Sequence, residues 1–152
     1  MTVQTNLEIK LAGVKQLDEL ASMFDAYRVW YGKESNLPAG RYFLFERTIN
    51  HESVAYIAYE QEKPVGFVQL YPCFSSININ AQWVLNDLFV IPEARQKGVG
   101  KALMQACIKL AQERGDLGLV LETGKNNTHA KALYEKLGFK LDTEFDRYTL
   151  TL

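Results

Sequence analysis

The chain reads Val90-Ile91-Pro92-Glu93-Ala94-Arg95-Gln96-Lys97-Gly98-Val99-Gly100-Lys101-Ala102-Leu103 where an apolar, strand-like run meets an amphipathic helix. A helix N-terminus presents backbone N–H groups without intrahelical acceptors, together with the positive end of the helix dipole, so it attracts anionic groups. Gly98 and Gly100 carry no Cβ atom that would keep a pyrophosphate away from these amides, and Arg95 and Lys97 add positive charge. Residues 90–103 therefore predict a phosphate-binding loop, although an ordinary strand–turn–helix connection fits the same pattern.

Length and composition are those of one globular domain, which we expect to span residues 1–152. The 17 basic and 18 acidic residues leave a formal net charge of −1, so the chain lacks the excess of positive charge that is typical of proteins that bind nucleic acid or an anionic membrane. Cys73 and Cys107 lie far apart without metal-ligand spacing. No apolar run approaches the about 18 residues of a membrane span, and residues 1–10 lack the layout of a signal peptide. We therefore expect a cytoplasmic protein without a metal site.

Apolar periodicity predicts a mixed sheet with helices on both faces, an α/β (α+β) fold. Strand-like runs occupy residues 7–11, 54–59, 65–71, 83–90, 117–121, 139–141 and 145–152. Apolar residues recur with helical spacing in four segments: between Gly13 and Gly32, after Pro38, over residues 100–114 and over residues 127–137. We expect a hairpin between the second and third strands, and we expect Pro72 to end the third, leaving residues 73–82 irregular.

Two nucleotide-binding motifs fail on spacing. A Walker A loop needs four residues between its glycines and Ser or Thr after the lysine, whereas Gly98-Val99-Gly100-Lys101 is followed by Ala102. A dinucleotide fingerprint needs a third glycine where Leu103 stands, although Glu122 ends the next strand, where a ribose-binding acid is expected. The dinucleotide site therefore stays an alternative.

Two longer motifs resemble the GNAT family of acetyl-CoA-dependent N-acetyltransferases, and the likeness spans most of the chain. The first is Arg95-x-x-Gly98-x-Gly100, which matches that family's pyrophosphate loop and follows Val90-x-Pro92. The second is Asn127-x-x-Ala130-x-x-Leu133-Tyr134-x-x-Leu137-Gly138-Phe139, which is similar to a helix and following strand of the family. The stretch Leu85-Asn86-Asp87-Leu88-Phe89-Val90 is distantly similar to the polyamine-acetylating branch, where a Glu replaces Asn86.

This resemblance implies a mostly antiparallel, twisted sheet of about seven strands whose central pair splays apart around acetyl-CoA, the co-substrate. It assigns cofactor contacts to Leu88, Phe89, Val90, Arg95, Gln96, Lys97, Gly98, Val99, Gly100, Lys101, Asn127 and Tyr134. Among these, Asn127 contacts the pantetheine or only caps its helix. Tyr134 stands at the family's acid position, where a phenol protonates the departing thiolate, and its alternative role is packing in an apolar helix stripe.

Asp87 is the second candidate catalytic residue. Asn86 and Asp87 interrupt an apolar strand, and a buried carboxylate without partners is costly, so we expect either hydrogen bonds to Asp87 or a bulge in the strand that exposes it. A protonated amine must lose a proton before it attacks a thioester. Asp87 is therefore a general base or water-positioning group, or else a structural anchor.

The expected acceptor is the primary amine of a small molecule, with protein lysine or N-terminal acetylation as one alternative. A non-catalytic acyl-CoA-binding regulatory module is the alternative from another class. Candidate acceptor contacts are Arg28, Tyr31, Tyr71, Trp83 and Glu122. A homodimer is possible through the edge strand expected at residues 145–152.

Overall fold

The computed structural model describes residues 6–152, and the chain divides into two compact units, Met1–Leu121 and Glu122–Leu152. The first unit holds a sheet and three α-helices, and the second holds one helix. A single domain over residues 1–152 stays a prediction, and part of the segment expected to lack a signal peptide lies outside the described residues. No described helix is long and apolar enough to cross a membrane.

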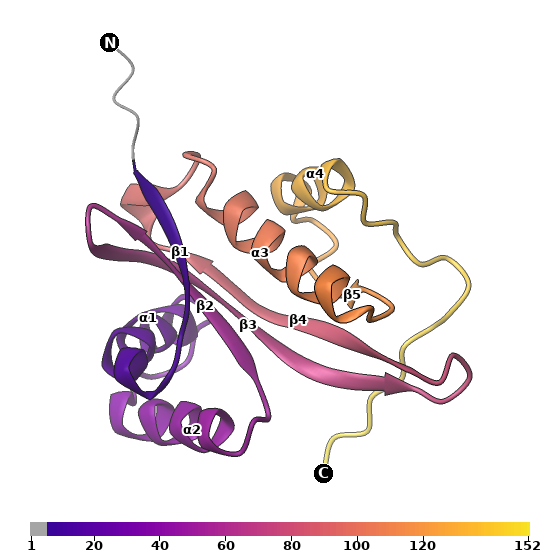
Figure 1. Ribbon diagram of the computed structural model, residues 1–152, viewed down its shortest axis with the longest axis horizontal. Helices are drawn as coiled ribbons and strands as arrows, with labels where there is room; N and C mark the ends of the chain where they lie inside the picture. The colour runs from indigo at the N-terminus through magenta and orange to yellow at the C-terminus, as the bar shows by residue number, and fades with distance from the viewer. Residues whose placement is uncertain (1–5) are drawn as a thin grey trace. The chain divides into compact units, whose positions relative to one another are not determined.

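A five-stranded sheet forms the centre of the first unit (Figure 1). In order across the sheet, its strands are β1 (Leu7–Leu11), β2 (Val54–Glu60), β3 (Lys63–Ser75), β4 (Asn80–Val90) and β5 (Leu119–Val120). The first four are antiparallel to their neighbours, and β5 runs parallel to β4. Gln61 and Glu62 join β2 to β3 with the positive φ angles, 50° and 66°, that suit a two-residue hairpin turn. The predicted mixed sheet and the predicted hairpin are both confirmed.

Strand β3 passes through Pro72, so the prediction that this proline ends the strand is wrong. Pro72 is paired with Trp83, and residues 73–82, expected to be irregular, mostly form the far end of the β3–β4 hairpin. β2 accompanies β3 only as far as Leu70, which leaves β3 with an open edge at Pro72. The N–H that proline lacks therefore breaks no ladder.

Helices cover both faces of the sheet, as predicted (Figure 1). α1 (Leu17–Trp30), which follows the 3-10 turn Val14–Gln16, and α2 (Leu37–Ile49) pack on one face, and α3 (Val99–Arg114) packs on the other. α1 is followed by Gly32, whose φ of 83° supplies the left-handed stop that the sequence indicated. The core between α1, α2 and the sheet consists of Leu17, Leu20, Ala21, Met23, Leu44, Ala55, Ile57, Tyr59, Phe67 and Phe89.

The second unit contains α4 (Thr128–Lys136) and an irregular segment after it. Asn127 caps α4, its side-chain oxygen accepting from the Ala130 N–H at 3.4 Å. The predicted strands at residues 139–141 and 145–152 are wrong. Asp142 accepts hydrogen bonds from the N–H groups of residues 144 and 145 at 2.9 and 3.2 Å, a local turn that competes with strand pairing. The edge strand on which a homodimer was expected is therefore not formed.

Candidate functional site

Strand β4 has a β-bulge in its middle. Gln69 of β3 lies opposite Asp87, and the next residue, Leu70, lies opposite Leu85, so Asn86 is an extra residue without a partner on β3. Asn86 is exposed, whereas Asp87 is only 5% exposed. The expected hydrogen bonds to Asp87 are confirmed, and the strand also bulges, but the bulge exposes Asn86 and leaves Asp87 buried. Two consecutive polar residues can occupy an otherwise apolar strand because one of them is turned out of the ladder.

Between the bulge and the end of β4, one edge of this strand has no neighbouring strand among residues 6–152. β5 is paired with β4 only at Trp83 and Val84 among the described residues. On the β3 side, the Ile91 N–H donates to the Val65 carbonyl at 2.9 Å. This bond shows which β4 residues have backbone groups that bond to β3. In an antiparallel pair, the backbone groups of successive residues point alternately toward the partner strand and away from it. Since Ile91 bonds to β3, the N–H and C=O groups of residues 88 and 90 point away from β3, to the open edge. The edge of β4 at residues 88 and 90 is therefore unpaired within the described residues, as the implied splay requires.

Two side-chain amides donate hydrogen bonds to the Asp87 carboxylate. Gln69 Nε2 donates to Oδ2 at 3.0 Å and Asn86 Nδ2 donates to Oδ1 at 3.1 Å, and the Tyr27 hydroxyl of α1 lies near enough to feel the charge of Asp87. Burial, and next the negative charge of Asp87, raise the pKa of Tyr27 above its ordinary value of 10.0. The sequence pointed to Asp87 but missed Gln69 and Tyr27. A glutamine inside the apolar run at residues 65–71 was the available signal.

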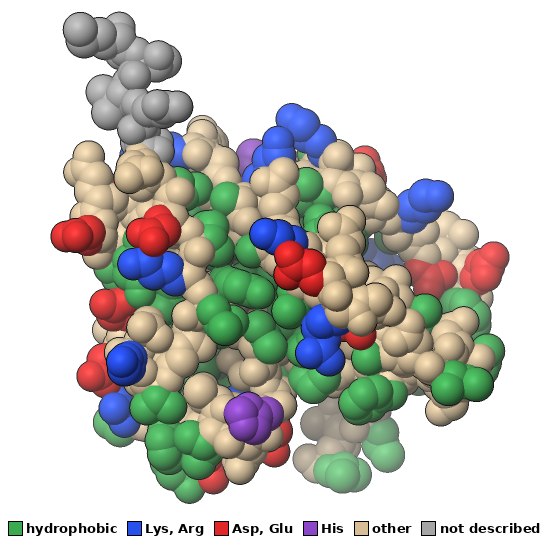
Figure 2. All heavy atoms as spheres, in the orientation of Figure 1, with side chains coloured by type: hydrophobic (Ala, Val, Ile, Leu, Met, Phe, Trp, Pro, Cys, Tyr) green, Lys and Arg blue, Asp and Glu red, His purple; other side chains and the backbone are tan. Residues whose placement is uncertain are grey.

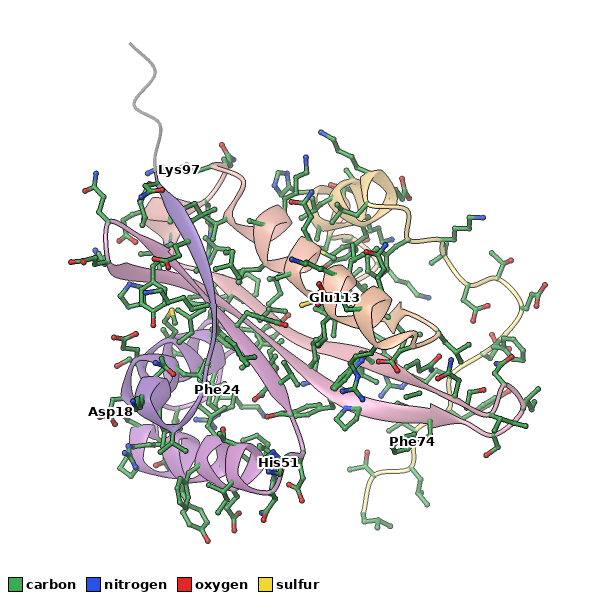
Figure 3. The ribbon with its side chains drawn as sticks, in the orientation of Figure 1. Asp18, Phe24, His51, Phe74, Lys97 and Glu113 are labelled. Carbon is green, nitrogen blue, oxygen red and sulfur yellow. The ribbon has the colours of Figure 1, made fainter. Side chains whose placement is uncertain are left out.

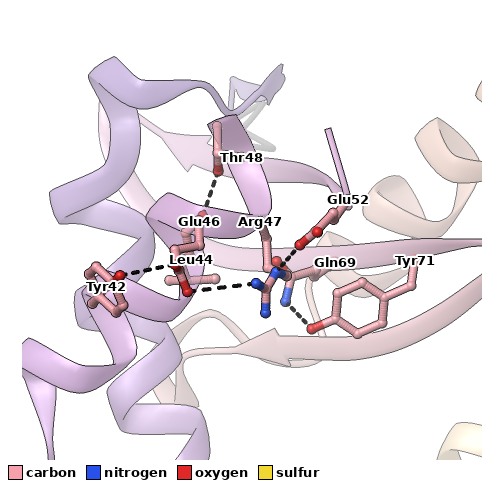
Figure 4. A network of polar contacts seen from close by, with 8 residues as sticks. All are labelled: Tyr42, Leu44, Glu46, Arg47, Thr48, Glu52, Gln69 and Tyr71. Atoms are coloured by element: carbon pink, nitrogen blue, oxygen red, sulfur yellow. Dashed lines mark hydrogen bonds and ion pairs between the residues drawn. The ribbon is translucent and has the colours of Figure 1, made fainter. Parts of the chain in front are cut away.

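Gln69 also contacts Tyr71, a half-buried residue of the same strand (Figure 4). Gln69 Nε2 donates to the Tyr71 hydroxyl at 2.9 Å. Burial and the charge of Asp87 raise the pKa of Tyr71 to about 12, and the positive charge of Arg47 opposes them. Arg47 in turn is paired with Glu52 at 2.5 Å. Tyr71 is therefore a protonated phenol, a hydrogen-bond donor, throughout the neutral pH range.

The loop before α3 has the backbone of an anion site. Gln96 and Gly98 both have left-handed φ angles, 60° and 81°. Gly98 is the N-cap of α3 and has no side-chain oxygen, so none of its atoms caps the first N–H groups of the helix. Lys97 is exposed at this end of α3, opposite the end that carries Glu113 (Figure 3). Free N–H groups, the helix dipole and the lysine charge all favour a bound phosphate here.

Arg95 is held against the protein at the base of this loop. Its Nε donates to the Val90 carbonyl at 2.9 Å. The guanidinium carbon lies 5.7 Å from the ring centre of Trp30 and 5.9 Å from that of Phe89. The side chain of Arg95 thus ties the loop to the end of β4 and to α1.

Two of the predicted acceptor contacts lie on α1 or at its end. The ring of Tyr31 is exposed and stands edge-on to Tyr27, with 4.9 Å between ring centres. Arg28 lies 3.9 Å from Asp25, one turn earlier. Through Tyr27, the aromatic end of α1 therefore reaches the Asp87 carboxylate.

Trp83 lies on the opposite face of the sheet, the one that α3 covers. Its Nε1 donates to Asp116 at 2.8 Å, and the Arg114 guanidinium lies 5.5 Å from its ring centre. The bulge is the physical reason, because the extra residue Asn86 reverses the alternation of side chains along β4. Asp87 therefore faces α1 while Trp83 faces α3, and the structure does not bring the two together.

The second unit carries the remaining candidates. Tyr134 lies on α4, and its ring centre is 6.0 Å from that of Phe139. Asn127 uses its side-chain oxygen for the cap and donates through Nδ2 to the hydroxyl of Thr123 at 3.2 Å. Glu122 forms an ion pair with Arg147. The helix thus presents Tyr134 beside an aromatic neighbour, with Asn127 as its structural cap.

Comparison with known proteins gives one consistent family. Residues 20–139 match the model of the acetyltransferase (GNAT) family. The chain is 40% identical over 146 residues to the uncharacterized N-acetyltransferase YhfO of Bacillus subtilis, covering 96% of this chain and 98% of that one. It is 33% identical over 137 residues to a probable acetyltransferase of Haemophilus influenzae, covering 90% and 92%. The crystal structure of a probable acetyltransferase, 39% identical, superposes with a TM-score of 0.91 and covers 95% of this chain and 97% of that chain.

Proposed function

This chain belongs to the acetyltransferase (GNAT) family and is an acyltransferase, and we propose that it transfers the acetyl group of acetyl-CoA directly to the primary amine of a small molecule. The observation that supports this proposal most is the hydrogen-bonded Asp87 carboxylate beside the open edge of β4. The carboxylate can bind the ammonium group of the acceptor, and the unpaired backbone groups of the strand edge can bind the acyl donor.

The open edge and the loop before α3 suit acetyl-CoA, which supplies a reactive thioester when it is bound. The outward N–H and C=O groups of Leu88, and the outward N–H of Val90, would pair with the amide groups of the pantetheine, in the stretch that includes Phe89. The Val90 carbonyl already accepts from Arg95, so we assign Arg95 to holding the loop. The first N–H groups of α3 would hold the pyrophosphate, in residues Gln96, Lys97, Gly98, Val99, Gly100 and Lys101.

Gly98→Ala is expected to weaken acetyl-CoA binding about tenfold, because a Cβ at a left-handed position shifts the amides that face the phosphate. Gly115→Ala is the matched control. Gly115 has a similar φ of 71° at the other end of α3, and an added Cβ meets nothing within 4 Å at either glycine. Calorimetric titration with acetyl-CoA should separate the two variants. Equal affinity in both would remove the loop from the cofactor site.

The reaction needs a group that accepts a proton and a group that supplies one. The amine of the acceptor has a reference pKa of about 10.4 and binds as an ammonium ion, which a carboxylate attracts. We assign Asp87 to receive the ammonium proton, directly or through a water, because the pKa of Tyr71 is raised to about 12 by burial and by Asp87 and this phenol stays protonated. We assign the Tyr134 hydroxyl to protonate the departing sulfur.

Direct transfer requires no cysteine nucleophile, and the surroundings of Cys107 support this route. Cys107 is buried in α3, and burial raises the pKa of its thiol to about 12. The reactive form of cysteine is the thiolate, which a raised pKa suppresses. Cys107 therefore packs against the sheet and carries no acyl group.

A small molecule is the proposed acceptor, held by Asp87, Tyr31 and Tyr71. The formal net charge of −1 provides no strong field for a basic protein partner, and acidic and basic side chains are interspersed on the face shown in Figure 2. Aromatic rings beside a carboxylate suit a compact ammonium ion. Acetylation of protein lysines or N-termini is the alternative.

The proposal is tested by incubating the protein with acetyl-CoA and a panel of polyamines, amino acids, aminoglycosides and lysine peptides while free thiol is measured. Amine-dependent thiol release with a small amine, and a product heavier by one acetyl group, would support it. Release with peptides alone would favour protein acetylation. Tight acetyl-CoA binding without release on any acceptor would favour a regulatory module.

A further inference from the structure

Within residues 6–152, aromatic residues aside, Gln69 and Asp87 are the two polar residues whose backbone and side chain together are buried, and they contact each other. Gln69 is 1% exposed and Asp87 is 5% exposed, and they lie directly opposite on β3 and β4. A buried polar group is costly unless its hydrogen bonds are made, and a pair of apolar residues would fill the same position in a strand at lower cost. The pair therefore calls for an explanation in the chemistry of the site.

The orientation of the Gln69 amide is fixed by its partners. Asp87 accepts from Nε2 at 3.0 Å, and a carboxylate can only accept, so the NH2 end of the amide must face it. The same nitrogen donates its second hydrogen to the Tyr71 hydroxyl at 2.9 Å. Because the Tyr71 oxygen accepts this hydrogen, its own proton is directed away from Gln69. Gln69 thereby sets the direction in which Tyr71 can donate.

We propose that Gln69 is a positioning residue for acetyl transfer: its amide holds the Asp87 carboxylate in place and keeps the Tyr71 hydroxyl as a donor toward the acceptor. This inference rests on the proposed function, and it adds a residue that contacts neither acetyl-CoA nor the acceptor. The neighbouring donor to Asp87, Asn86, is exposed on the bulge, and Tyr27 belongs to α1. Gln69 donates to both the Asp87 carboxylate and the hydroxyl of Tyr71, a candidate acceptor contact on its own strand.

The test is a double-mutant cycle of Gln69→Leu and Asp87→Asn, measured as kcat with the best small amine. Gln69→Leu alone should lower kcat about tenfold, because the carboxylate loses its alignment, while acetyl-CoA affinity changes less than about twofold. In the Asp87→Asn protein the same substitution should cost less than about twofold, because its effect passes through Asp87. Equal losses in both backgrounds, or wild-type kcat in the folded single variant, would overturn the proposal.

Two further variants distinguish a loss of positioning by Gln69 from a general loss of stability. Ile57→Val removes one methyl from a fully buried core residue on the neighbouring strand β2, and we expect its kcat to match that of the wild type. Tyr71→Phe leaves the core intact and should lower kcat/KM for the amine about tenfold. Wild-type kcat/KM in Tyr71→Phe would contradict the assigned direction of donation. Absence of any acetyl transfer by the wild-type protein would instead sink the proposed function.

Discussion

Asp87→Asn is expected to lower kcat for acetyl transfer about 10²-fold, with acetyl-CoA affinity nearly unchanged. Asparagine has almost the same shape as aspartate but neither accepts a proton from an ammonium ion nor attracts it as an anion. Burial is the main cause of the raised pKa of Tyr27 and of Tyr71, and the charge of Asp87 adds to it, so both phenols should titrate at somewhat lower pH in the variant. Steady-state thiol release measures kcat, and ultraviolet absorbance against pH follows the phenols.

Asp116→Asn is the matched control for this substitution. The Asp116 side chain is 6% exposed and bonds Trp83 and Arg114 on the α3 face, so it resembles Asp87 in burial but lies on the other side of the sheet. Its kcat should stay within about twofold of the wild-type value. If both variants lose activity equally, the loss reflects stability, and Asp87 is a structural anchor.

Tyr134→Phe is also expected to lower kcat about 10²-fold while leaving acetyl-CoA affinity intact. Phenylalanine keeps the ring contact with Phe139 and removes only the hydroxyl that we assign as proton donor to the departing sulfur. The effect should be largest with acetyl-CoA and smaller with an acyl donor whose leaving thiol is more acidic, because such a thiol needs less help from an acid.

The control is Tyr148→Phe, which makes the same chemical change at a fully exposed tyrosine of the same unit. Its kcat should equal that of the wild type. Unchanged turnover in Tyr134→Phe would return that residue to the packing stripe of α4, leaving the acid function to another group or to water.

Much of the fold could be predicted because it follows from periodicity and glycine positions. β1 begins and ends where the apolar alternation does, and α1 stops before Gly32, as a left-handed C-terminal residue requires. The errors concern pairing, which is not local. Pro72 is tolerated because β2 has already ended beside it, and residues 145–152 need a neighbouring strand that a local pattern cannot supply.

The site shows the same division between local and non-local information. Asp87 stood out because a carboxylate in an apolar run needs partners. Gln69 was overlooked because its significance depends on lying opposite Asp87 across two strands. The face that Trp83 occupies is not predictable from local alternation, because one extra residue in β4 reverses that alternation and only the paired structure shows where the extra residue falls.

The bulge at Asn86 has a consequence for comparing this protein with its relatives. The face of the sheet to which a β4 side chain points depends on whether the extra residue Asn86 is present. In a relative that lacks this residue, a carboxylate on the α1 face would stand at a different position of a sequence alignment. Carboxylates of such relatives should therefore be matched by the face of the sheet they occupy. Matching them by alignment position alone would equate Asp87 with a residue whose side chain points at α3.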